Sequence, residues 1–354
     1  MELNLTLLAN DASEELAGTG NVSQHAWIRA YKQASGLVCA AVGIAGTIGS
    51  ILLMILICRQ RRELRSSIDQ LYINIAVTTL VFSVVSCPLH AYTAIVGRSN
   101  FLATSRYAGL CQAAGFIYRE IIAVDFLIHA SIALHRFFIV VVTVNRFPWL
   151  RSRVCAGIFV ITPWLVAAVV LVFPLFGLGV KYGYTHQFDR CAFTYTSSSS
   201  LVYFRFCMIF FTFVALTVNV ACYSAILVKL ILTRRRQMRI VPRWQARLVS
   251  RYQMERERTV TKTAFAMCLV FMVCALPPGI FSLSASVRDL ESPLFRALII
   301  LFSIGSVTSA WMIILTTPGL RTTFIDCIKR RHPTAETRNH EMVNMTNRTR
   351  HIQL

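Results

Sequence analysis

The chain has 354 residues, of which 55% are hydrophobic and only 15% are charged. Its 36 lysines and arginines against 16 aspartates and glutamates give a formal net charge of +20. A soluble domain carries about 25% charged residues, whereas the mean hydropathy here is +0.58. Disorder, a collagen-like chain and a small disulfide-stapled scaffold are therefore disfavoured. Nucleic-acid binding is also disfavoured, because the basic residues stand between apolar runs. The composition indicates a polytopic membrane protein.

Seven apolar segments are long enough to cross a hydrocarbon core of about 30 Å as helices. They lie at 36–58, 71–95, 108–142, 154–178, 201–233, 263–283 and 293–316. We therefore expect an all-α fold, a seven-transmembrane helix bundle over 34–318, preceded by an extracellular segment at 1–33. The remaining residues, 319–354, are expected to form a short amphipathic eighth helix at 320–332 and a cytoplasmic tail.

The lysines and arginines of the short loops predict the orientation. The first loop carries Arg59 and Arg61, the second carries Arg146 and Arg151, and the connection between the fifth and sixth segments is basic throughout. These alternate loops are expected in the cytoplasm, so the N-terminus is expected outside the plasma membrane. Two N-terminal Asn-x-Ser/Thr triplets are then either glycosylation acceptors or chance matches; they begin at Asn4 and Asn21.

Three motifs recur at the spacing of a known family. The second segment reads Asn74-x-Ala76-x-x-Thr79-Leu80, the third ends in His135-Arg136-Phe137, and the sixth reads Phe271-x-x-Cys274-Ala275-x-Pro277. They resemble Asn-Leu-Ala-x-x-Asp-Leu, Asp-Arg-Tyr and Phe-x-x-Cys-Trp-x-Pro of the rhodopsin-like (class A) G-protein-coupled receptors. A Cys-Pro-Leu sequence at 87–89 adds a faint similarity to melatonin-like receptors.

The chain departs from the family at several motif positions. The tryptophan of the sixth segment is Ala275, and Ser309-Ala-Trp-Met-Ile stands where Asn-Pro-x-x-Tyr belongs. Pro277 is retained and should kink its helix. With Phe271 and Cys274 it would form what remains of the activation relay.

The resemblance implies a disulfide between Cys111 and Cys191; the alternative is two unpaired thiols. It also implies that Arg136 contacts a G protein, together with Phe137 and with Tyr223 on the fifth segment. His135 replaces the acid that restrains this arginine, which predicts high basal activity or a pH-dependent restraint. The alternative is that Arg136 only extends its charge to the membrane interface.

An intramembrane acid stands at an unusual place. The sodium-binding aspartate of the second segment is Thr79 here, whereas the third segment carries Asp125 on one helical stripe with His129 and Arg136. A charge facing lipid at mid-membrane costs about 2.5–3.5 kcal/mol on insertion scales. Asp125 is therefore expected inside the bundle, where it could bind sodium or a proton with Thr79, Ser306 and Ser309. A protonated Asp125, or an Asp125–His129 pair, is the alternative.

The outer third of the bundle combines cations with aromatic residues. Amine receptors place an aspartate where this chain has Tyr118, and opsins need a lysine in the seventh segment, which is absent. Arginine favours carboxylate ligands, so the expected ligand is an anionic or amphipathic small molecule. Pairing of Arg119 with a nearby acid is the alternative. The candidate pocket residues are Tyr118, Arg119, Ile122, His90, Tyr92 and Arg205.

These observations favour a receptor that transmits an extracellular signal to heterotrimeric G proteins, with arrestin as a further partner. A non-signalling or arrestin-biased scavenger receptor is the alternative, and a transporter is a weaker one. No nucleophile–base or metal-ligand constellation suggests an enzyme, and no cofactor beyond a sodium ion is expected. Lipid contact and no nucleic-acid partner are expected. Cys327 in the eighth helix is either a palmitoylation site or a structural thiol.

Overall fold

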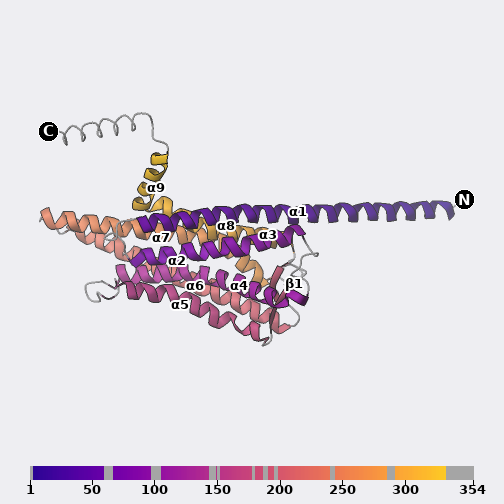
Figure 1. Cartoon of the computed structure of the whole chain (residues 1–354), viewed down its shortest axis with the longest axis horizontal. Coiled ribbons are helices and arrows are strands. Elements are labelled where there is room, and N and C mark those ends of the chain that lie inside the picture. The colour runs from indigo at the N-terminus through magenta and orange to yellow at the C-terminus, as the bar shows by residue number, and fades with distance from the viewer. Residues whose placement is uncertain are drawn as a thin grey trace, which may run out of the picture.

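The computed structural model describes residues 3–59, 67–96, 105–142, 149, 152–177, 180–185, 190–194, 198–239, 244–284 and 292–331. Side chains are described within these ranges except at 3–28, 105, 190, 198, 234–239, 244–258, 260 and 328–331. The described part is almost entirely helical, as Figure 1 shows. Its α-helices are α1 (Leu3–Arg59), α2 (Ser67–Val81), α3 (Cys87–Val96), α4 (Ala108–Val140), α5 (Arg153–Leu171), α6 (Ser198–Arg239), α7 (Trp244–Ser284), α8 (Pro293–Thr316) and α9 (Pro318–Arg331).

Seven helical segments among the described residues are long and apolar enough to cross a membrane, as predicted. They are Arg29–Arg59, Ser67–Val96, Ala108–Val140, Arg153–Phe176, Ser199–Thr233, Thr261–Ser284 and Pro293–Thr316. The expected seven-helix fold is confirmed, and the chain is a multi-pass membrane protein. The predicted eighth helix is confirmed as α9, whose Leu320 is buried against the bundle.

The helix α4 lies at the centre of the bundle. Its most apolar 18-residue window is 67% buried, whereas that of the Arg153–Phe176 span is 22% buried. It contacts α2, α5, α6 and α7. Side chains at four- and three-residue steps therefore point into the bundle from this helix, and Ile122, Asp125, His129, Ile132 and Arg136 are all buried.

The second span contains a π-helical turn, Phe82–Ser86, between α2 and α3. The backbone N–H of Cys87 donates to the Phe82 carbonyl oxygen, five residues back. Pro88 follows directly and has no N–H to continue the ordinary hydrogen-bond pattern. The π-helical turn accommodates the missing donor locally, since π-turns occur as single-turn interruptions of α-helices.

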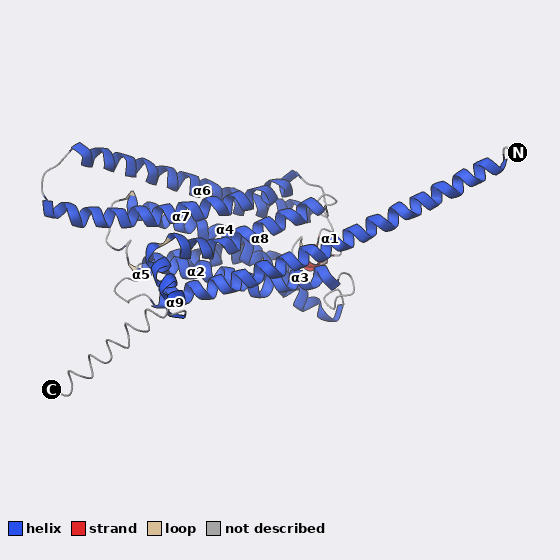
Figure 2. Ribbon diagram, turned by 90° about the horizontal axis from the view of Figure 1, so that it is seen from above, coloured by secondary structure: helices blue, strands red, loops and turns tan. Residues whose placement is uncertain are grey.

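A hairpin of two strands, β1 (Lys181–Thr185) and β2 (Arg190–Thr194), lies at the end of the bundle from which the N-terminal part of α1 projects (Figures 1 and 2). The strands are antiparallel, with Tyr182 opposite Phe193 and Tyr184 opposite Cys191. Both strands contact α4. The α9 helix and the far ends of α6 and α7 lie at the opposite end (Figure 2). The bundle therefore has one end covered by the hairpin and one end bordered by the extended helices.

The proposed domain boundaries stay predictions. The helix α1 runs through residue 33 without interruption, because it extends from Leu3 to Arg59. Helices α6 and α7 also continue beyond their apolar spans, to Arg239 and from Trp244. Hydropathy reported only the apolar part of each of these helices.

Candidate functional site

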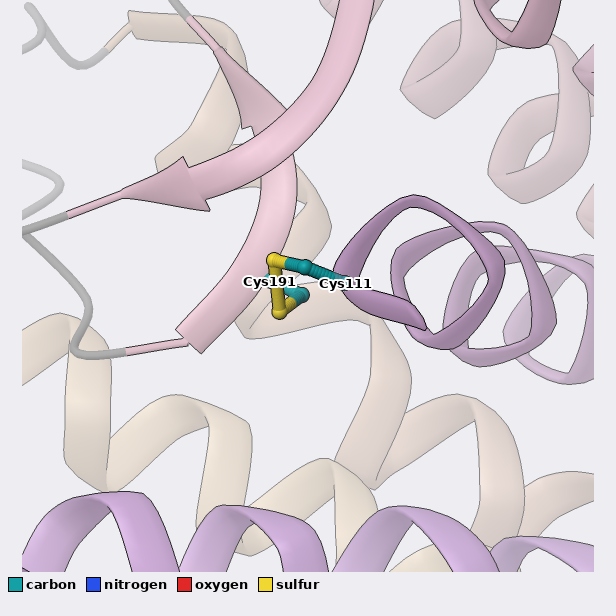
Figure 3. Close-up of a disulfide and its surroundings, with 2 residues drawn as sticks. All are labelled: Cys111 and Cys191. Atoms are coloured by element: carbon teal, nitrogen blue, oxygen red, sulfur yellow. A yellow bond between two sulfur atoms is a disulfide. The ribbon is translucent and has the colours of Figure 1, made fainter. Parts of the chain in front are cut away.

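A disulfide fastens the hairpin to the central helix. Cys111 lies in the first turns of α4 and Cys191 lies on β2, 80 residues later, with 5.2 Å between their Cα atoms. Figure 3 shows the bond reaching from the strand to the helix end. The disulfide predicted from the family resemblance is confirmed. It holds the hairpin over the N-terminal end of α4.

Beneath the hairpin, α4, α6, α7 and α8 enclose a small cavity. Its volume is about 40 Å³, which leaves room for a few waters at most, since one water needs about 10–15 Å³. The wall is largely apolar. It is formed by Tyr118, Arg119, Ile122, Phe126, Phe204, Met208, Thr212, Ala275, Pro278, Gly279, Ser282, Phe295, Ile299 and Phe302.

Arg119 is the charged side chain of this wall, and it is enclosed by aromatic rings. Its guanidinium carbon lies 4.9 Å from the ring centre of Phe193, 5.1 Å from that of Phe204 and 5.9 Å from that of Tyr118. The residue is only 8% exposed, and its Nε has no hydrogen-bond partner among the described residues. Cation–π contacts within about 6 Å stabilise such a buried cation, but they leave its hydrogen-bonding capacity free.

The hairpin packs against Arg119 and the neighbouring helices through aromatic contacts. Tyr182 stacks on Phe193 with ring centres 5.0 Å apart, and its hydroxyl donates to the Leu171 carbonyl oxygen at 3.1 Å. Burial raises the pKa of Tyr182 above its ordinary value, and the nearby Arg119 partly opposes this rise. Tyr182 is therefore neutral at physiological pH and cannot neutralise Arg119.

The predicted ligand residues divide into two groups. Tyr118, Arg119 and Ile122 line the cavity together. His90, Tyr92 and Arg205 are not among its lining residues, and Tyr92 is 38% exposed. Assignment of these three to a ligand site stays a prediction, and Phe193, which sequence analysis did not single out, lies against Arg119 instead.

The four residues predicted for the ion site are all buried in the bundle core: Asp125, Thr79, Ser306 and Ser309. The Ser306 hydroxyl interacts with the Asp125 carboxyl group, although neither carboxylate oxygen has a hydrogen bond of ordinary geometry among the described residues. The Thr79 hydroxyl likewise has no described partner. Ser309 faces His129, with 3.5 Å between its Oγ and the histidine Nε2. The core therefore contains oxygen atoms suited to a hard cation or to water.

The predicted relay residues lie where α7 meets α4 and α8. Phe271 is fully buried and packs edge-on against Phe126 and Phe302, with ring centres 5.3 and 5.9 Å apart. Cys274 is buried beside Gly305 of α8, where an added Cβ would lie 2.5 Å from the Cys274 Cβ. Pro277 is followed by Pro278 inside the same helix. The glycine allows α8 to approach α7 closely at the level of the relay.

At the inner end of α4, the predicted coupling residues are mostly buried. Arg136 is 3% exposed and lies within electrostatic reach of Tyr72 on α2 and Tyr223 on α6. His135 is buried and contacts Phe159 of α5 edge-on at 5.5 Å. Neither of its ring nitrogens has a hydrogen-bond partner among the described residues.

Phe137, the third residue of the motif, is half-buried beside Phe138. His135 therefore does not make the hydrogen bond to Arg136 that an acid at this position could make.

The modification sites are only partly described. The side chains of Asn4 and Asn21 fall outside the described part of the chain. Cys327 is half-buried on α9, and its sulfur accepts from Nη1 of Arg59 at 3.1 Å. Both assignments, glycosylation and palmitoylation, stay predictions.

Comparison with known proteins gives consistent matches. Residues 49–311 match the family model described as 7 transmembrane receptor (rhodopsin family). A blue-sensitive opsin of Carassius auratus is 28% identical over 240 residues, 66% of this chain and 63% of the opsin. A G0-coupled rhodopsin of Mizuhopecten yessoensis is 26% identical over 259 residues, 69% of this chain and 58% of that protein. The chain thus spans less than two thirds of either relative.

The crystal structure of squid rhodopsin shares the fold. The TM-score is 0.70 at 18% identity, with 89% of this chain and 91% of that chain covered. These two relatives are an opsin and a rhodopsin by name, yet α8 contains no lysine. With the seven spans, the disulfide and the retained motifs, the family match is decisive. The chain belongs to the rhodopsin family of seven-transmembrane receptors.

Proposed function

We propose that this protein is a plasma-membrane receptor, with its N-terminus outside the cell, that couples an extracellular ligand to a heterotrimeric G protein. The observation that carries the proposal is Arg136, a buried arginine between Tyr72 and Tyr223 at the inner ends of three helices. A guanidinium held there becomes available to a partner when the helices separate. The relative described as a G0-coupled rhodopsin supports the same class of partner.

Ligand binding would act by shifting a two-state equilibrium. Pro277 and Pro278 interrupt the backbone hydrogen bonds of α7, so this helix has a natural bending point between the cavity and the cytoplasm. Outward movement of the inner half of α7 would open the space beside Arg136. Because His135 cannot pair with Arg136 as an acid would, the closed state is weakly restrained and basal activity is expected.

The ligand is an anionic or amphipathic small molecule. Arg119 supplies one cationic group with free hydrogen-bonding capacity, and Ile122, Phe126 and Phe302 supply an apolar wall below it. A carboxylate could replace the aromatic faces as the partner of Arg119. Since drug-sized sites measure about 300–1,000 Å³, the cavity must open when the ligand binds.

A sodium ion or a proton at Asp125 would tune this equilibrium. The carboxylate has Ser306 within reach, and the hydroxyls of Thr79 and Ser309 are buried in the same core. Oxygen ligands fit such a hard ion. An ion bound in this core would stabilise the conformation in which these helices are packed together.

An arrestin-biased or scavenging receptor is the second candidate function. The observation that favours it is the bond from the Trp311 indole to the Ala45 carbonyl oxygen. It ties α8 to α1 at the place where the family's seventh-helix motif supports G-protein activation. A receptor whose α8 is held in this way could bind ligand and arrestin without activating G proteins.

Nucleotide exchange on purified heterotrimers by the full chain in lipid nanodiscs tests the proposal. We expect the chain to accelerate exchange on at least one Gα class, and Arg136→Ala to abolish the acceleration. Arg119→Ala should leave basal exchange intact but remove any thermal stabilisation by long-chain carboxylates. Absence of exchange, together with arrestin binding, would favour the second candidate.

A further inference from the structure

His129 lies where α4, α7 and α8 meet inside the bundle. Its ring is 1% exposed and stacks on Phe271 of α7, with ring centres 4.1 Å apart and planes inclined by 20°. Its Nε2 lies 3.5 Å from the hydroxyl oxygen of Ser309 on α8. One side chain of the central helix therefore contacts both α7 and α8.

The Ser309 hydroxyl lies between the backbone of α8 and the His129 ring. It donates to the Gly305 carbonyl oxygen at 3.3 Å. The same hydroxyl also faces His129 Nε2, and which of the two groups donates depends on the tautomer of the ring. This long contact orients the ring, because Nδ1 has no hydrogen-bond partner among the described residues.

Phe271 is otherwise surrounded by rings that have no polar group. Phe126 and Phe302 touch it edge-on, at 5.3 and 5.9 Å, and stack on each other at 5.7 Å. His129 is anchored on α8 through Ser309. Movement of α7 away from α4 must therefore separate the faces of His129 and Phe271.

At the C-terminal end of α4, His135 does not supply a comparable polar contact. The ring nitrogens of His135 make no hydrogen bond within the described ranges, so His135 does not bind Arg136 as an acid at this position could. We infer that His129 is the positioning residue that holds α7 against α4 and α8, acting through the Phe271 ring and the Ser309 hydroxyl. Its role in signalling rests on the proposed function, whereas its role in holding α7 does not.

A distance measurement in the full-length protein tests this inference. Spin labels are attached at Lys262→Cys on α7 and Arg153→Cys on α5, two exposed sites at the cytoplasmic ends of the membrane spans of these helices. The background carries Cys58→Ser and Cys327→Ser, because the other seven described cysteines outside the disulfide are buried. Pulsed electron–electron double resonance in nanodiscs then measures the distance between the two labels. It gives the populations in which the labelled site of α7 lies close to α5 or distant from it.

We expect His129→Leu to shift the ratio of the two populations towards distant α7 by about three- to tenfold, the effect of one aromatic contact. Ser309→Ala should shift it in the same direction by less, and the double variant no further than His129→Leu. His129→Phe, which keeps a stacking ring, should restore most of the close population. Ser303→Ala is the matched control, because that buried hydroxyl donates only within α8, to Ile299, at 2.9 Å.

Distance distributions for His129→Leu and Ser309→Ala that coincide with the Ser303→Ala control would overturn the inference. The same samples are assayed for nucleotide exchange. A shifted distance with no exchange in any sample would uphold the role of His129 and contradict the proposed G-protein coupling. An unshifted distance with normal exchange would contradict the role of His129 and uphold the proposed G-protein coupling.

Discussion

Trp311 of α8 lies directly over Gly49 of α1. Its indole N–H donates to the Ala45 carbonyl oxygen at 3.2 Å, and a Cβ built on Gly49 would lie 2.6 Å from the indole nitrogen. This side chain stands within the segment where the family's Asn-Pro-x-x-Tyr motif belongs. Where the family has a proline-kinked motif, this chain therefore has a close α1–α8 contact that requires a glycine at position 49.

Gly49→Ala is expected to destabilise the protein by about 1–3 kcal/mol, because the added methyl group must displace the half-buried indole and its hydrogen bond. Thermal unfolding in detergent micelles measures the effect. Gly157→Ala is the control, since a Cβ there meets nothing within 4 Å and alanine favours the helix. Equal melting temperatures for the two variants would contradict the contact.

Cys191→Ser should lower the free energy of unfolding by about 2–4 kcal/mol, the usual contribution of a disulfide. The hairpin would lose its covalent tie to α4, and surface expression should fall with stability. Cys155→Ser provides the control, because it removes a buried thiol of α5 that forms no disulfide. A Cys191→Ser protein as stable as this control would show that the bond contributes nothing.

The parts of the fold that follow hydropathy could be predicted from the sequence. Long apolar runs locate the spans because each helix must satisfy its own backbone in lipid. The hairpin could not be predicted, because five-residue strands in a short polar loop carry little periodic signal. The extension of α6 to Arg239 and of α7 from Trp244 was also missed. These turns lie beyond the apolar spans that hydropathy reports.

The site divides in a similar way. Helical spacing predicted that Tyr118, Ile122 and Asp125 share one inward stripe, and they do face the bundle. Phe193 was missed because its contact with Arg119 depends on how the hairpin folds back, which no local pattern records. His129 carried a visible signal, a polar ring on the inward stripe, but its partner Phe271 is distant in sequence and only packing reveals the stack.

Sodium is expected to raise the melting temperature of the unliganded protein, and Asp125→Asn should remove this dependence. The reason is that an ion among buried oxygen atoms binds only the folded state. Titration with sodium chloride against choline chloride at constant ionic strength separates binding from screening. Identical sodium curves for the parent and Asp125→Asn would exclude an ion site and leave a protonated carboxyl group.

His135→Asp should lower basal G-protein activation roughly fivefold, because a carboxylate can form the charge-assisted hydrogen bonds with Arg136 that histidine does not make. His135→Asn matches the size of the acid without its charge, so it should change basal activation much less. Both are compared in a cell-based assay at equal surface expression. A drop of the same size in both variants would attribute the effect to shape rather than to a restored ion pair.

The most direct test of the account is basal activation of a panel of Gα subunits in cells that express the full chain or Arg136→Ala at matched surface level. Arg153→Ala, which removes an exposed arginine at the same end of the bundle, controls for loss of a cytoplasmic charge. The account predicts activation of at least one Gα class by the parent and by Arg153→Ala, and loss of that activation in Arg136→Ala. Activation that survives in Arg136→Ala would contradict the proposed coupling site.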